Sequence, residues 1–368
     1  MFGTVLTILF TLVLAYVLWR AGWVSIRGRR LSRRLRLGIG AGLWSIFLLG
    51  RLIGHDGSGA LAAGFEFAGM FLLGWVFLTA LALLAVDLIT LFGLLLRRWL
   101  ARLRAAALVA GGLLAVFALI QGLRAPALVE HEVVLAGLPA ALDGTVLVAL
   151  SDTHLGTQLG GAWFAARMRQ IEALQPDLLV FLGDIFEGHG GALSDLPVLR
   201  RLQPPLGKWH VHGNHEGHGR RRGRQRPDLL ARAGSRLLHN AWAEPATGLV
   251  LAGVEDLTGR RRRGRGGGQP VAAALADRPA GATVLLSHTP WRVEQAAAAG
   301  VDLMLSGHTH GGQIWPFGLL GRAVYPHFVG RYSVGDMTLI VSRGAGTWGP
   351  RMRLWHRGEI LRVVLRAK

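Results

Sequence analysis

The sequence predicts an α/β domain, α+β-like in its last part, that follows an all-α transmembrane region of about four helices. Nearly all the long apolar runs lie within residues 1–124. After Arg124, short apolar runs bounded by Gly and Pro alternate with stretches of helical spacing, which indicates strands and helices in turn. The C-terminal runs are separated by Gly-rich turns, which favours antiparallel strands. We therefore expect a mixed sheet, or a sandwich of two mixed β-sheets flanked by helices, over residues 125–368.

Four apolar segments in the first part approach the roughly 20 residues that a membrane-spanning helix requires. The second segment is short and contains Arg51, and the third is longer than a span needs and contains Asp87. The predicted spans are 2–19, 37–53, 67–96 and 105–123. Residues 1–124 are therefore expected to anchor the protein in the lipid bilayer.

Charges in the predicted loops indicate an orientation. The loop between the first two spans and the loop between the last two are rich in arginine, whereas the loop between the second and third carries Asp56 and Glu66 and no Lys or Arg. Basic loops remain on the cytoplasmic side. Four spans then place residues 125–368 outside the cytoplasm. If the weak second span does not insert, the cytoplasmic face is the alternative.

Asp87 is the ionisable residue deepest in a predicted span. An intramembrane carboxylate is a functional candidate by default. The simpler interpretation is that Asp87 lies near the membrane interface or contacts another span. A transporter would require paired polar residues across several spans, and only Asp87 and Arg51 are available, so that class is disfavoured.

The second part contains recognisable strands and helices. Residues 129–135 are β-branched and partly alternating, which predicts a strand. Helical spacing, Pro at the start and Gly at the end predict helices. We expect helices over 163–174, 227–238 and 290–299, and C-terminal strands over 337–341 and 360–365.

Five further apolar runs each lead into potential metal ligands. The runs are 146–150, 178–182, 209–211, 284–286 and 303–305, and the residues that follow them are Asp152 with His154, Asp184, Asn214 with His215, His288, and His308 with His310. Sites in α/β sheets form at the carboxyl ends of strands. These side chains can therefore meet at one edge of a sheet, although they span nearly 160 residues.

This set of residue types fits a pair of divalent metals. Two metals about 3.5–4 Å apart can bind the attacking and leaving oxygens of a phosphoryl transfer, and a carboxylate suits the position between them. A mixed His, Asp and Asn set favours Mn, Fe or Zn over Ca. Glycines 183, 213 and 307 would let the backbone turn sharply at the strand ends. The absence of cysteine excludes a Cys-based zinc site and a thiol nucleophile.

The ordered motifs resemble the calcineurin-like metallophosphoesterase superfamily. The chain looks closest to the bacterial membrane-associated branch, with Ser-Asp-Thr-His-Leu-Gly at 151–156 and Ser-Gly-His-Thr-His-Gly-Gly-Gln at 306–313. The resemblance covers roughly residues 129–365 and does not cover the membrane half. Together with the four predicted spans, it implies a multi-pass protein of the bacterial inner (cell) membrane with a metallophosphoesterase catalytic domain.

The resemblance also implies roles for individual residues. Asp152, His154 and His310 would bind the first metal, Asp184 would bridge, and Asn214, His288 and His308 would bind the second. A hydroxide held between the metals would attack phosphorus in line. His215 would not bind metal but would donate a proton to the leaving oxygen or stabilise charge on the phosphoryl group. Glu187 stands where many relatives have Asp and is not expected to be a ligand, and Glu216 is expected to support the ligands.

The implied activity is hydrolysis of a phosphodiester or a pyrophosphate, with a lipid-linked substrate among the candidates. The alternative is a non-catalytic membrane scaffold or binding module that retains the fold. Arginine clusters within 220–226 and 260–265 suit a phosphate-rich substrate or anionic lipid headgroups, although they equally suit a solvated insertion. Nucleic acid is not favoured, because no nucleic-acid-binding module accompanies the charge.

Overall fold

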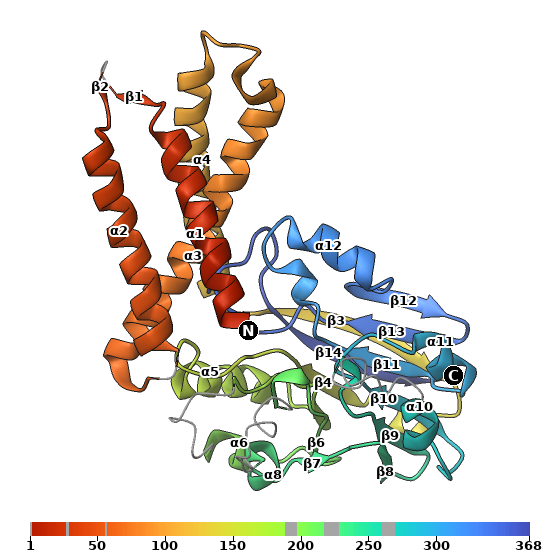
Figure 1. The fold of residues 1–368 in the computed structure, drawn as a ribbon. Coiled ribbons are helices and arrows are strands. Elements are labelled where there is room, and N and C mark those ends of the chain that lie inside the picture. Colours follow the sequence, from red (N-terminus) through yellow and green to blue (C-terminus); the bar gives the residue numbers. More distant parts are fainter. Residues whose placement is uncertain (1, 27–28, 56, 188–196, 217–227, 259–268) are drawn as a thin grey trace. The chain divides into compact units, whose positions relative to one another are not determined.

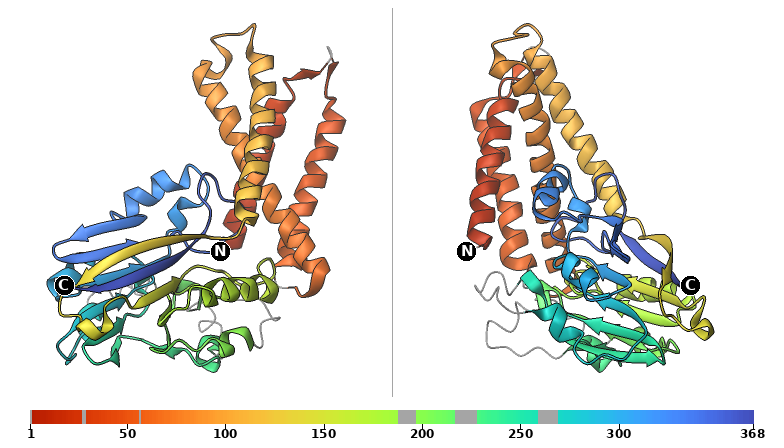
Figure 2. Two further views of the ribbon diagram at one scale, coloured as in Figure 1. Left: turned by 180° about the vertical axis from the view of Figure 1, so that it is seen from behind. Right: turned by 90° about the vertical axis from the view of Figure 1, so that its right-hand side faces the viewer.

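The computed structural model describes residues 2–26, 29–55, 57–187, 197–216, 228–258 and 269–368. The chain forms two compact units (Figures 1 and 2). The helical unit comprises residues 1–124 together with 349–355, and the second unit comprises 125–348 and 356–368. The two arginine clusters predicted as exposed loops, within 220–226 and 260–265, lie outside the described residues.

In its described residues, the helical unit contains four helices long and apolar enough to cross a membrane, as predicted. Helices α1 to α4 lie alongside one another (Figure 1). Their bounds are α1 Phe2–Ala21, α2 Arg33–Leu49 extended by the π-helical η1 Gly50–Gly54, α3 Gly59–Ile89 and α4 Leu100–Leu123, with a short pair β1 Ser25–Ile26 and β2 Arg29–Arg30 and a 3-10 turn η2 Leu91–Gly93. The weak second span is thus a continuous helical segment, in which Arg51 donates a hydrogen bond to the carbonyl of Gly3 at 2.6 Å.

Asp87 is fully buried and contacts two other helices of this unit. Its carboxylate lies 2.6 Å from Nε of Arg20 on α1 and 3.1 Å from a guanidinium nitrogen of Arg104 on α4. The hydroxyl of Tyr16 donates to the same carboxylate at 2.7 Å. These contacts match the simpler interpretation of Asp87, in which it binds neighbouring helices.

Segment 349–355 packs with the helical unit although it lies far along the chain. The amide of Arg353 donates to the carbonyl of Ala118 at 2.8 Å. The side chain of Gln121 donates to the carbonyl of Trp355 at 3.2 Å.

The second unit is a sandwich of two mixed six-stranded sheets. One sheet has the order β3 Ala127–Leu135, β14 Glu359–Ala367, β4 Val146–Leu150, β5 Leu178–Phe181, β6 Lys208–His210, β7 Arg236–Leu237. The other has the order β12 Gly330–Val334, β13 Met337–Val341, β11 Leu303–Ser306, β10 Ala282–Leu286, β9 Leu249–Gly253, β8 Ala241–Ala246. Strands β4 to β7 run parallel, as do β9, β10, β11 and β13, which aligns the carboxyl ends of each set.

Side-chain alternation explains why the sheets pack face to face. Leu147 and Ala149 of β4 lie in the core between the sheets, while Val148 and Leu150 lie in the core beneath the outer helices of their sheet. On β10, Val284 and Leu286 face the central core, and Leu285 faces outward. Strands buried on both faces are expected to be continuously apolar, as these are.

The helices and 3-10 turns of this unit are short. They are η3 Ala140–Leu142, α5 Gly161–Glu172, α6 Pro197–Arg201, α8 Leu229–Arg232, α10 Pro270–Ala274, α11 Val293–Ala298, η4 His310–Gly312 and α12 Phe317–Val324. The prediction of a helix through residue 238 was wrong, because α8 ends at Arg232 and Gly234 has a φ of +85°. The chain then enters β7. The C-terminal strands are only partly antiparallel, since β14 pairs antiparallel with β4 and parallel with β3.

Candidate metal centre

The predicted ligands lie at the carboxyl ends of five strands that come from both sheets. Strands β4, β5 and β6 belong to one sheet, and β10 and β11 to the other. Each set is parallel within its sheet, so its strand ends share one edge. The edges formed by the strand ends of the two sheets lie on the same side of the sandwich. The predicted ligands converge there.

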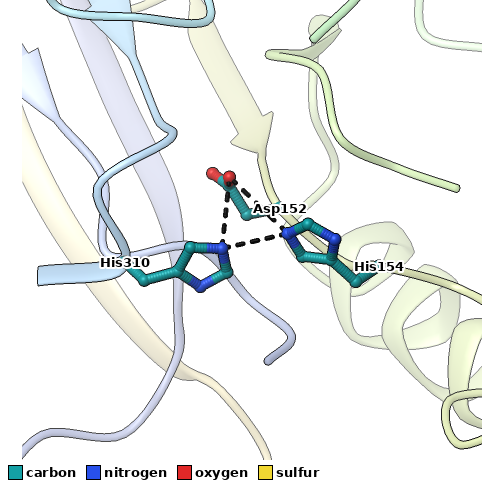
Figure 3. Close-up of side chains that lie close together, drawn as sticks. All are labelled: Asp152, His154 and His310. Atoms are coloured by element: carbon teal, nitrogen blue, oxygen red, sulfur yellow. Dashed lines mark hydrogen bonds and ion pairs between the residues drawn. The ribbon is translucent and has the colours of Figure 1, made fainter. Parts of the chain in front are cut away.

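The first group consists of Asp152, His154 and His310. The three side chains point toward one another (Figure 3). Nε2 of His154 lies 3.0 Å from Nε2 of His310, and Nε2 of His310 lies 3.5 Å from a carboxylate oxygen of Asp152. Asp152 and His154 are buried.

The second group consists of Asp184, His288 and His308, with Asn214 beside them. Nε2 of His288 lies 3.2 Å from each of three other atoms that could bind a metal: Oδ2 of Asp184, Nδ1 of His308 and Oδ1 of Asn214. The other nitrogen of His288 bonds to the carbonyl of Leu182 at 2.8 Å, which fixes the ring. A hydrogen bond of this kind commonly orients a histidine that binds a metal.

Asp184 lies between the two groups. Its Oδ2 is 3.2 Å from Nε2 of His288 and 4.0 Å from Nε2 of His154. Adjacent ligand atoms on one ion lie about 3 Å apart when the bonds to the metal are about 2.1 Å long. Most donor atoms within the two groups are 3.0–3.5 Å apart, and Nε2 of His154 lies 4.0 Å from Asp152, so each group could hold a metal ion.

The charges within the second group shift the pKa values of its members in different directions. Burial lowers the pKa of His288, but the Asp184 carboxylate outweighs burial and raises that pKa to about 10. Burial raises the pKa of Asp184, yet the charge of His288 outweighs it and holds that pKa well below its usual range. Burial, aided by the charge of His288, lowers the pKa of His308 to about 3. Asp184 is thus held anionic and His308 neutral, which are the forms that bind metals, whereas a metal ion would have to displace the proton on His288.

His215 lies beside both groups. Its Nε2 is 3.8 Å from Oδ2 of Asp184, its Nδ1 is 3.0 Å from Glu187, and its ring packs edge to face on His154 at 4.8 Å between centroids. Burial lowers the pKa of His215, but the hydrogen bond to Glu187 and the charge of Asp184 outweigh it and raise that pKa to about 9. His215 therefore carries a proton at neutral pH next to the shared carboxylate.

Glu187 and Glu216 support the centre in different ways. Glu187 bonds to Nδ1 of His154 at 2.6 Å as well as to His215, so it holds one predicted ligand and the predicted proton donor. Glu216 accepts hydrogen bonds from the backbone N–H groups of residues 184, 185, 186 and 213. It thereby ties the loop after β5 to the loop after β6.

The strand-end glycines serve two purposes. Gly183 has a φ of +90°, so it makes the sharp turn that the sequence predicts. Gly213 and Gly307 have no such angle; a Cβ at Gly213 would collide with the Asp184 carboxylate, and one at Gly307 with Ser151 and Asp152. These two positions need glycine because a ligand side chain occupies the space.

Sequence reasoning missed Tyr325. Its hydroxyl lies 2.8 Å from Nε2 of His308, and its ring stacks on Trp291. No motif or periodicity marks this residue, because its position depends on how the chain returns after α12. Glu187 was noted at its motif position, but its bond to both histidines was not foreseen.

The fold and the site together define a metallophosphoesterase domain joined to membrane-length helices. The family model described as "Calcineurin-like phosphoesterase" matches residues 145–312. A zebrafish (Danio rerio) "Transmembrane protein with metallophosphoesterase domain" is 34% identical over 278 residues, which cover 71% of this chain and 62% of the relative. A protein of the same name from Bos taurus is 32% identical, over 69% of this chain and 60% of its own length.

An "Uncharacterized metallophosphoesterase" from Aquifex aeolicus is 35% identical over 240 residues, which cover 63% of this chain and 88% of the relative. The chain belongs to the calcineurin-like metallophosphoesterase family. It spans less than two thirds of the length of the two vertebrate relatives. The predicted family and fold are thus confirmed, and with its four apolar helices the protein is membrane-anchored.

Proposed function

We propose that the protein is a membrane-anchored phosphoesterase with a dinuclear metal centre that hydrolyses a phosphodiester or a pyrophosphate. The observation that supports this most is the position of Asp184 between two groups of ligands, with His215 beside it. A structural role alone does not explain why four imidazoles and two carboxylates converge at these strand ends.

The two groups divide the proposed ligands. Asp152, His154 and His310 would hold one ion, Asn214, His288 and His308 would hold the other, and Asp184 would contact both. Bound Mn, Fe or Zn ions supply Lewis acidity toward phosphoryl oxygens and make water a stronger nucleophile at neutral pH.

The residues of the chain position and protonate the reacting groups. Glu187 and the backbone hydrogen bond from His215 to Asp184 fix the His215 ring with Nε2 toward the centre. His215 can therefore donate a proton to the oxygen that leaves phosphorus, or stabilise negative charge on the phosphoryl group. General acid catalysis of this kind contributes roughly 10²–10⁴-fold in rate.

Hydrolysis of bis-p-nitrophenyl phosphate by the full-length protein with Mn²⁺ tests the proposal. We expect Mn²⁺-dependent turnover that falls about 10²–10⁴-fold in His215→Ala and is lost in Asp184→Asn. His239→Ala, an exposed histidine outside the site, is the matched control. No Mn²⁺-dependent turnover, or turnover that the two site variants leave unchanged, would favour the non-catalytic scaffold.

We further propose that the protein lies in the cell membrane of a bacterium and that its second unit (residues 125–348 and 356–368), here called the catalytic unit, lies outside the cytoplasm. The arginines clustered within residues 20–36 and 97–104, and the absence of Lys and Arg from residues 54–66, which contain Asp56 and Glu66, support this orientation. A reporter that is active only in the cytoplasm, fused after Lys368, should be inactive. Activity of the reporter would instead place the catalytic unit on the cytoplasmic face.

A further inference from the structure

Large apolar side chains are exposed on one segment next to the metal centre. On α12 and just before it, Leu319 and Leu320 are 60% and 63% exposed, and Trp315, Phe317 and Val324 are exposed as well. We call these five residues, together with exposed Trp348, the α12 patch. Among the described residues of the catalytic unit, the other exposed large apolar side chains are Leu128 and Val134, both on β3.

Helix α12 contacts the rest of its unit through its glycines and not through its large apolar side chains. A Cβ at Gly321 would collide with the ring of Phe328, and the backbone of Gly318 lies against Gly312. A helix on the surface of a soluble protein buries its apolar face. Here the glycines occupy the buried side, so the leucines remain exposed and forgo about 1.5–3 kcal/mol each of burial free energy.

The α12 patch borders the second ligand group on one side and His215 on the other. Tyr325 follows α12 directly and bonds to His308. On the other side, Gln313 exchanges two hydrogen bonds with the backbone of Trp348, whose ring lies edge to face with His215 at 6.2 Å between centroids. A molecule held on this patch would therefore lie beside the proposed proton donor and beside the second group.

A lipid bilayer is the occupant that fits best. The catalytic unit follows the four membrane-length helices directly in the chain, so these helices would tether it to a bilayer. The eight residues of α12 are far too few to span the membrane, which needs about 20. Exposed leucines with Trp315 at one end and Arg322 near the other are the composition of a segment that lies in the lipid interface.

We propose that the α12 patch inserts into the interfacial region of the bilayer, at the depth of the lipid headgroups, and that the substrate is the phosphoester headgroup of a membrane lipid. This rests on the proposed phosphoesterase function and adds the class of substrate. The acyl chains would remain among the lipids beside α12 while the phosphate enters the centre.

Depth of insertion can be measured because the chain has no cysteine. The full-length protein is placed in lipid nanodiscs with a fluorescent label on Leu320→Cys or, as the matched control, on Val134→Cys, which is similarly exposed on β3. Nitroxide-bearing lipid should quench the label at residue 320 about twofold or more while aqueous iodide quenches it weakly, and the control should show the reverse. Equal iodide quenching at both positions, or shielding of residue 320 from both quenchers, would overturn the proposal; the latter would indicate a protein partner.

The substrate class is tested by inhibition of bis-p-nitrophenyl phosphate hydrolysis in the same nanodiscs. Dioleoyl phosphatidic acid and glycerol 3-phosphate carry the same phosphate group with and without acyl chains. Phosphatidic acid should inhibit the unmodified protein at a lower concentration than glycerol 3-phosphate does. The ratio of the two inhibition constants, which is the advantage of the lipid, should fall about fivefold or more in the double variant Leu319→Gln/Leu320→Gln and persist in Val134→Gln. An unchanged advantage would overturn the lipid inference, whereas absence of hydrolysis in the unmodified protein would overturn the proposed function itself.

Discussion

At the scale of single residues, the candidate centre is held in unfavourable backbone conformations. Positive φ angles, uncommon outside glycine, occur at five predicted ligands: Asp152 (52°), His154 (48°), Asp184 (52°), His308 (71°) and His310 (51°). Such conformations cost about 1–3 kcal/mol each and persist where surrounding contacts enforce them. The amides of Asp152 and His154 donate to the carbonyls of Gly183 and Asp184, so the ligand loops hold one another in place.

Glu187 provides a test of this positioning. Glu187→Gln keeps the size of the side chain but removes the charge that orients His154 and His215. We expect a loss of about 10–100-fold in activity or metal affinity, as for other residues that orient metal ligands. Glu187→Asp, which keeps the negative charge, should retain more activity than Glu187→Gln.

Steady-state hydrolysis and metal titration of the full-length variants measure both effects. Glu130→Gln is the control, since this glutamate is exposed and its ion pair with Arg362 is long at 3.6 Å. A kcat/KM of Glu187→Gln within about twofold of the unmodified protein would contradict the positioning role.

At the scale of elements, the strands with ligands at their ends were the predictable part. Apolar runs of five residues or fewer define β4, β5, β10 and β11 within one or two residues, because parallel strands buried on both faces carry a continuous signal. The strand order is not visible in the sequence: β14 inserts between β3 and β4, and the ligands come from two sheets. Convergence of the ligands was predictable from their type and order, but the sandwich that produces it depends on long-range packing.

Short elements were less predictable, as α8 and β7 illustrate. The residues after Asp228 have helical spacing, but tertiary contacts shorten the helix. Asp228 caps α8 through the amide of Ala231 and accepts hydrogen bonds from His210 and His212, both at 2.9 Å. Residues 236–237 then pair with β6, an interaction that local spacing does not reveal.

The carboxylate of Asp228 should make stability depend on pH. Burial raises its pKa, but the hydrogen bonds from His210 and His212 outweigh burial and hold the pKa below its usual range. A depressed folded-state pKa contributes stability above the unfolded-state value near 3.9, and this stability is lost as the pH falls. Asp228→Asn should therefore be less stable by about 1.5–3 kcal/mol at pH 7.

Thermal unfolding followed by tryptophan fluorescence between pH 7 and about pH 2 measures this difference, because the stabilisation is lost only as the pH falls from the unfolded-state pKa toward the lower folded-state pKa. The difference in stability between the unmodified protein and Asp228→Asn, which we call the gap, should narrow at the acidic end of this range. Asp336→Asn, in the exposed turn between β12 and β13, should show no such gap. A gap that stays constant or widens on acidification would contradict the assigned direction.

At the scale of the whole molecule, hydropathy predicted the number of membrane helices but not the contacts within their unit. The apolar run that contains Asp87 indicated a span over 67–96, whereas α3 covers Gly59–Ile89 and includes Glu66. The partners of Asp87, Arg20 and Arg104, lie near the ends of α1 and α4, where they were counted only as loop charge. Asp87, Arg20 and Arg104 therefore form one buried set of charged contacts between helices, which explains why all three charged residues occur there.

The central claim is that one chain binds two metals that share Asp184. Elemental analysis of the purified full-length protein and of Asp184→Asn, after loading with Mn²⁺ and removal of free ions, tests it most directly. We predict two ions per chain in the unmodified protein and at most one in Asp184→Asn, because the shared carboxylate is lost from both groups. A single ion or none in the unmodified protein, or an unchanged content in Asp184→Asn, would contradict the account.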